Sequence, residues 1–176
     1  MMMVALVLPS SAALTTFQQY NGNVGYSADG FGSTSQAGTI SASVPVGSTV
    51  LAAYLYSASF FNSTGAGVGG TLAGTALSGG TFSLNPVSGD LGATRFNVTS
   101  IVKPLIDGGA GGVYNFSITE TSSSQDGEAL VVVYSNGSLA ASTFAILDGF
   151  SAVGGDSFTA NFATPLNPNS AGLLCH

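Results

Sequence analysis

Residues 128–134 read Glu-Ala-Leu-Val-Val-Val-Tyr, and residues 50–56 read Val-Leu-Ala-Ala-Tyr-Leu-Tyr. After the leading glutamate, both runs are apolar at successive positions and rich in β-branched and aromatic side chains. The side chains of a strand point alternately to its two faces, so a run of this kind predicts a strand that is covered on both faces. The two runs therefore predict the centre of a layered β-protein.

Shorter segments of the same character occur along the rest of the chain, bounded by clusters of Gly, Asn and Ser. Residues 143–147 are expected to form a hairpin with 128–134 through the turn at 135–138. Further strands are expected at 39–46, 71–72, 75–77, 94–98, 113–120 and 157–162. About nine or ten short strands predict an all-β antiparallel β-sandwich, either a jelly roll or immunoglobulin-like.

At most one short helix is expected. Thr99 or Ser100 is placed to cap a segment that runs through Ile106, with Pro104 inside it and two glycines after its end.

The chain is almost free of charge. Only 6% of its 176 residues are charged, against about 25% in an average protein. Arg95 and Lys103 are the only Lys or Arg residues, and the net charge is -6. Two isolated cations form no basic stripe, which argues against nucleic-acid binding and against polybasic attraction to lipid. Because the hydrophobic fraction is an ordinary 45%, a folded domain with a hydroxyl-rich surface is expected.

The two ends of the chain predict an exported protein. Residues 1–8 are apolar, and Pro9 and four small residues follow, a pattern typical of a signal peptide over residues 1–13. The basic residues that normally precede such a segment are missing, so a truncated start is expected. The β-sandwich domain is assigned to residues 14–165 and a tail, also expected to be truncated, to 166–176. No other apolar run approaches the roughly 18 residues of a transmembrane helix.

Few residues are suited to catalysis. The only cysteine and histidine are Cys175 and His176, at the very end, where the backbone is least constrained. A serine nucleophile needs a base, so no catalytic residue is assigned and no cofactor is expected. Gly65–Gly70 matches the pattern G-x-G-x-x-G, but no helix is predicted after it, so the match is interpreted as chance.

The acidic residues offer the remaining candidates. Each aspartate adjoins a glycine, as in turns. Asp126 and Glu128 are nevertheless candidate ligands for calcium, although no EF-hand-like loop surrounds them. Glu120 and Glu128, the only glutamates, are the pair on which a glycoside hydrolase would depend. Lys103 is expected to be solvated or paired with a carboxylate.

Several segments together resemble a known family. They are residues 50–59, 70–75, 95–102, 113–116, 127–136 and 145–150, and the resemblance covers roughly residues 50–162. The order of these segments is similar to that in the extracellular β-sandwich domains of bacterial secreted proteins that often carry a PEP-CTERM sorting signal. This chain has Ser57 where the family has tryptophan and Asn97 where it has aspartate. The resemblance implies export, a surface or exopolysaccharide setting and no enzyme activity.

The expected function is that of a secreted, non-enzymatic protein of the cell surface or extracellular matrix. Its expected partners are extracellular polysaccharide or other surface proteins. A glycan- or calcium-binding module is the alternative. An outer-membrane β-barrel and a glycoside hydrolase are further hypotheses that the sequence favours less.

Overall fold

A computed structural model describes residues 14–32 and 34–151. The predicted signal segment, the predicted strand at 157–162, the tail and the terminal Cys175 and His176 lie outside these residues. The described part holds eleven strands and one helix. They are β1 (Thr15–Gly22), β2 (Val24–Phe31), β3 (Ala37–Val44), β4 (Thr49–Ser59), β5 (Gly70–Leu72), β6 (Thr75–Ala76), β7 (Thr81–Leu84), β8 (Gly92–Asn97), α1 (Thr99–Ile106), β9 (Gly112–Glu120), β10 (Gln125–Ser135) and β11 (Ser142–Asp148).

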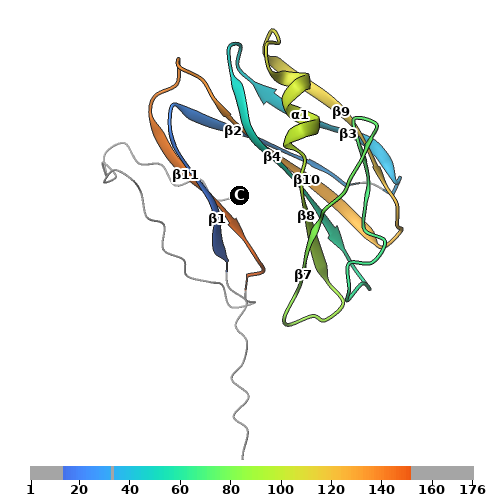
Figure 1. The fold of residues 1–176 in the computed structure, drawn as a ribbon. Coiled ribbons are helices and arrows are strands. Elements are labelled where there is room, and N and C mark those ends of the chain that lie inside the picture. The colour runs from blue at the N-terminus through green and yellow to red at the C-terminus, as the bar shows by residue number, and fades with distance from the viewer. Residues whose placement is uncertain (1–13, 33, 152–176) are drawn as a thin grey trace, which may run out of the picture.

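The predicted antiparallel sandwich is confirmed, and its strand order is that of a jelly roll. One sheet has the order β2-β10-β4-β8-β7 and the facing sheet the order β3-β9-β5-β6 (Figure 1). When β7 is set aside and the remaining strands from β2 to β10 are counted in chain order, the sheets read 1-8-3-6 and 2-7-4-5. This interleaving of strands from both halves of the chain defines the double Greek key of a jelly roll.

A two-stranded ribbon adds a third layer. Strands β1 and β11 pair with each other and cover the outer face of the five-stranded sheet (Figure 1). The predicted hairpin of residues 128–134 with 143–147 is therefore wrong, because β10 pairs with β2 and β4 while β11 pairs with β1. The apolar residues of β11 pack on the outside of the sheet that contains β10, so both segments bury their apolar side chains without forming one hairpin.

Strand β4 is covered on both faces, as its apolar run predicts. Ala53 and Leu55 belong to the core between the two sheets, whereas Ala52 and Tyr54 pack under the ribbon. The pairing of β4 with β10 shifts register between Val50 and Ala52. This bulge turns Val50 into the inner core and leaves Leu51 exposed.

Helix α1 follows β8 and lies beside the first half of β4 (Figure 1). Its bounds match the predicted segment, but the predicted side-chain cap is wrong, because the N-cap is Val98 and makes no side-chain bond. The hydroxyl of Thr99 instead accepts a hydrogen bond from the backbone N–H of Ala53 at 2.9 Å. The helix thus binds an edge of β4 that β8 does not reach.

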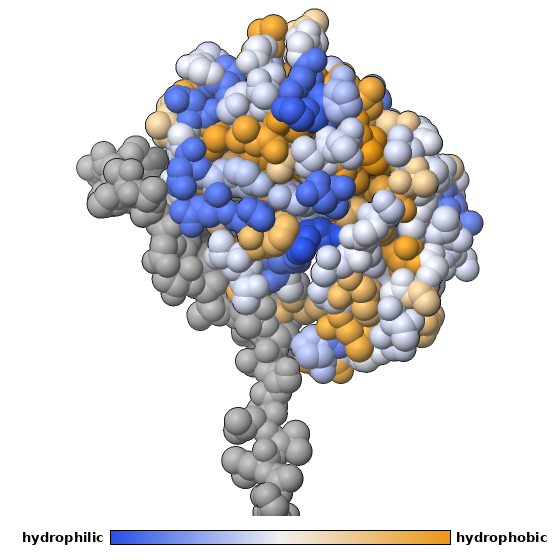
Figure 2. All heavy atoms as spheres, in the orientation of Figure 1, coloured by the Kyte–Doolittle hydropathy of each residue, from blue (hydrophilic) through white to orange (hydrophobic). Residues whose placement is uncertain are grey.

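The predicted tight turn at Ala73-Gly74 is confirmed, since β5 and β6 pair on either side of it. The surface seen in Figure 2 consists largely of residues of intermediate hydropathy, with small hydrophilic and hydrophobic groups scattered between them. This agrees with the hydroxyl-rich composition.

Candidate functional site

The inner face of the five-stranded sheet changes character at the end of β4 that lies away from α1. Its central part is apolar, but the last positions carry polar side chains that are nearly inaccessible to solvent. Polar groups are costly to bury unless they find partners, so such a layer calls for a specific explanation. We call these residues the polar layer; they are Ser57, Ser59, Thr94, Gln125 and Glu128.

A bulge places two residues of the polar layer on the same face. Gln125 and Glu128 are three positions apart, which in a regular strand would point them to opposite faces. The register shift between them and the positive φ of Gly127 (124°) turn both side chains inward. A Cβ on Gly127 would lie 2.8 Å from the carbonyl oxygen of Phe31, so this position requires glycine.

The same bulge separates the two predicted calcium ligands. Asp126 is exposed, whereas Glu128 is 6% exposed. The acid that acts on Glu128 is Glu120, at the end of β9 on the facing sheet. The sequence predicted Glu128 and Asp126 as a pair of metal ligands, but the structure brings Glu128 together with Glu120. This second pair was considered only as a hydrolase dyad.

Gln125 fixes the geometry of Glu128. Its Oε1 accepts hydrogen bonds from the backbone N–H groups of Gly69, Thr121 and Ser122, which orients its amide. Its Nε2 therefore points at the polar layer and donates to Glu128 Oε1 at 3.3 Å. Ser57 Oγ donates to the same oxygen at 3.0 Å. One oxygen of the Glu128 carboxyl group thus has two donors.

Sequence reasoning missed Gln125 and Ser57 as functional neighbours. The signal that could have identified them is a glycine inside a strong strand, because such a glycine often marks a bulge.

The second oxygen of Glu128, Oε2, is buried and has no hydrogen-bond donor. Burial and the nearby charge of Glu120 raise the pKa of Glu128 to about 7, against the opposing bonds from Ser57 and Gln125. Glu120 follows the buried Phe116 and Ile118 at alternating positions of β9, and the N–H of the next residue, Thr121, donates to Gln125. The negative charges of two neighbouring carboxylates repel each other, and a bound proton or cation relieves this repulsion.

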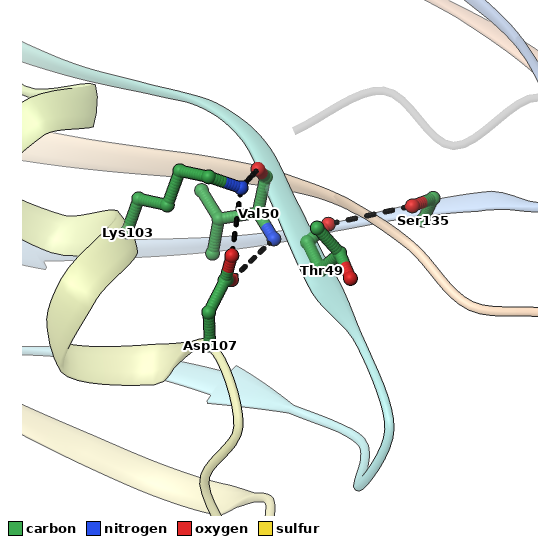
Figure 3. A network of polar contacts seen from close by, with 5 residues as sticks. All are labelled: Thr49, Val50, Lys103, Asp107 and Ser135. Carbon is green, nitrogen blue, oxygen red and sulfur yellow. Dashed lines mark hydrogen bonds and ion pairs between the residues drawn. The ribbon is translucent and has the colours of Figure 1, made fainter.

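The opposite end of β4 shows a charged pair whose groups all have partners. Lys103 and Asp107 of the α1 segment form an ion pair at 2.7 Å (Figure 3). Lys103 Nζ donates to the carbonyl oxygen of Val50 at 2.6 Å, and Asp107 Oδ1 accepts from the N–H of Val50 at 2.7 Å. We call this arrangement the Val50 clamp. It confirms that Lys103 pairs with a carboxylate.

The second cation is also structural. Arg95 on β8 forms an ion pair with Asp148 of β11, and its guanidinium lies 3.6 Å from the ring centre of Phe17 on β1. It thereby ties the ribbon to the five-stranded sheet by charge and by a cation–π contact. Both fixed cations of the chain are engaged away from Glu120 and Glu128.

An open groove of about 410 Å³ runs beside β11. Tyr26, which is 47% exposed, and Phe144 line it, with ring centres 5.4 Å apart. Ser142, Thr143 and Leu139 are among its other lining residues. The groove therefore combines an exposed aromatic face with polar and apolar walls.

The surroundings of the glycine motif agree with its interpretation as a chance match. The segment after Gly65–Gly70 is β5 rather than the helix that a dinucleotide site requires. Within residues 14–32 and 34–151, no three His, Cys, Asp or Glu side chains cluster as metal ligands. In the same residues, no helix has the length and hydropathy needed to cross a bilayer. The chain matches no protein-family model, no curated protein and no solved structure.

Proposed function

We propose that the chain is an exported, non-enzymatic β-sandwich of the cell surface or extracellular matrix that associates with polysaccharide. The observation that carries the proposal is the use of both fixed cations. Arg95 joins the ribbon to the sheet and Lys103 joins α1 to β4, so neither serves a phosphate or an anionic substrate. Recognition is left to hydroxyl, amide and aromatic groups, which are the groups that bind neutral sugars.

Export is tested with the chain's own N-terminal segment. A reporter fused to residues 1–40 and expressed in a bacterium is expected in the periplasm or the medium. The matched control carries residues 14–40 only and is expected to stay in the cytoplasm. Cytoplasmic retention of the first fusion would contradict the proposal.

A glycan-binding module is the second candidate, and the groove at Tyr26 and Phe144 favours it. Exposed aromatic rings provide the apolar platform on which the C–H face of a pyranose stacks. The volume of about 410 Å³ lies within the usual range of ligand sites.

Titration of the chain with a panel of neutral polysaccharides tests this candidate. Tyr26→Ala is expected to reduce binding at least tenfold. Phe61→Ala, which removes an aromatic ring that is 81% exposed outside the groove, is expected to leave binding unchanged. An equal loss of affinity in both variants, or no binding to any polysaccharide of the panel, would count against a glycan site in the groove.

A further inference from the structure

We propose that Glu120 and Glu128 together form a binding site for a hard divalent cation, with calcium as its natural occupant. The site closes the sandwich at the end of β4 that lies away from α1. It differs from the predicted pair of Asp126 and Glu128, because the partner acid comes from the facing sheet.

The first argument is the position of the two acids. Glu128 on β10 is buried in the sandwich, and Glu120 at the end of β9 is partly exposed. Gln125 connects the two positions, because it accepts from the N–H of Thr121, next to Glu120, and donates to Glu128. Each of the two sheets supplies one of the acids, so a bound ion would join the sheets. The chain has only two fixed cations, Arg95 and Lys103, and both are engaged in other ion pairs. No Lys or Arg can therefore neutralise the pair.

The second, independent argument is a buried oxygen that lacks a partner. Glu128 is more than nine-tenths buried, Gln125 and Ser57 occupy only its Oε1, and Oε2 has no donor. Ser59 Oγ, on the same inner face of β4 and opposite Gln125, is also buried without a partner. Native structures leave few such atoms, and a bound ion is a common reason for them.

The chemistry of these atoms fits calcium. Calcium takes carboxylate, hydroxyl and water oxygens in a flexible shell, and the two carboxyl groups supply ligands of the first kind. Soft metals prefer thiolate and imidazole ligands, and the polar layer contains neither. With two acids, the affinity is expected in the range of extracellular modules, at a Kd of roughly 10⁻⁴–10⁻³ M.

Calcium titration of the full chain, freed of metal with a chelator, tests the proposal by calorimetry and by thermal unfolding. We expect one equivalent to bind and Tm to rise at about 10 mM CaCl₂, which is roughly ten times the weakest expected Kd. KCl at equal ionic strength is expected to leave Tm unchanged. The absence of both heat and a Tm shift would overturn the proposal.

Three variants with the same change of charge localise the site. Glu128→Gln and Glu120→Gln are each expected to weaken calcium binding at least tenfold, whereas Asp126→Asn, at the exposed neighbouring acid, is expected to stay within twofold of wild type. If either glutamine variant fails to fold, the other still decides the question. Retained binding in the glutamine variants, or a loss confined to Asp126→Asn, would overturn the assignment.

Discussion

The two ends of strand β4 handle charge in opposite ways. At the Val50 clamp, an acid, a cation and the backbone of one residue satisfy one another. At the polar layer, two acids face each other and neither fixed cation of the chain reaches them. In a chain with so few charges, the first arrangement is explained by folding alone. The two acids at the polar layer destabilise the folded state unless a proton or an ion is bound. The polar layer is therefore the better candidate for a functional site.

The largest expected effect comes from the core that both ends share. Leu55 is fully buried midway along β4 between the clamp and the polar layer. Leu55→Ala is expected to reduce the free energy of unfolding by about 2–5 kcal/mol, because it leaves a cavity that the sheets cannot close. Urea titration measures the loss. Leu51→Ala, on the exposed side of the same strand, is expected to cost less than about 1 kcal/mol.

The next largest expected effect is a dependence of stability on pH that comes from the polar layer. The pKa of Glu128 is raised from 4.5 to about 7 in the folded chain, chiefly by burial and then by Glu120. The folded state therefore binds a proton more tightly than the unfolded state. In metal-free buffer, stability is greatest below about pH 4.5 for this group and falls as the pH rises to about 7. The loss is on the order of 3 kcal/mol, since one pKa unit corresponds to about 1.4 kcal/mol.

Urea titrations from pH 4 to pH 8 check this slope. Glu128→Gln is expected to remove it, and Asp126→Asn is expected to keep it. The clamp acts in the opposite direction. Burial alone would raise the pKa of Asp107, but hydrogen bonds from Lys103 and Val50 and the charge of Lys103 lower it. The contribution of Asp107 is therefore lost only as the pH falls through its lowered pKa.

Gly127→Ala breaks the geometry of the polar layer without changing its charge. Alanine is strained at a φ of 124° and its Cβ meets the backbone of Phe31, so a loss of about 1–3 kcal/mol is expected. Because the bulge aims both Gln125 and Glu128 inward, the calcium response is expected to disappear as well. Gly137→Ala, where the added Cβ meets nothing within 4 Å, is the matched control. An unaltered calcium response in Gly127→Ala would contradict the role given to the bulge.

The smallest effect concerns the end that α1 covers. Thr99→Val keeps the shape of the side chain but leaves the N–H of Ala53 without its acceptor. A loss of about 1 kcal/mol is expected, with no change in calcium binding. Thr39→Val, at an exposed strand position, provides the reference for an ordinary threonine substitution. Thermal unfolding with and without calcium measures both quantities.

The fold was largely predictable because its central strands are apolar on both faces. The runs at 50–56 and 128–134 identified β4 and β10, and Thr99 and the glycines after Asp107 marked the bounds of α1. Strands β1, β2 and β7 were missed because they are short of apolar residues and pack at the edges or over the sheet. The false hairpin arose because proximity in sequence cannot show that β11 crosses to a third layer.

The candidate site was only partly predictable, and the reason is local. Asp126 and Glu128 were proposed as calcium ligands because they are acids close together in the sequence. The bulge at Gly127 instead places Gln125 and Glu128 on the same inner face and leaves Asp126 exposed. The approach of Glu120 depends on how two sheets stack, which periodicity along one strand does not encode.

Two charge-matched variants test the central claim most directly. Glu128→Gln and Asp107→Asn each remove one negative charge from opposite ends of β4. At pH 8 in metal-free buffer, Glu128→Gln is expected to increase the free energy of unfolding, because it removes a buried charge that faces Glu120. Asp107→Asn is expected to decrease the free energy of unfolding by about 0.5–1 kcal/mol, because the ion pair with Lys103 is lost. Changes of opposite sign in the free energy of unfolding support the account, and a decrease of this free energy in both variants would contradict it.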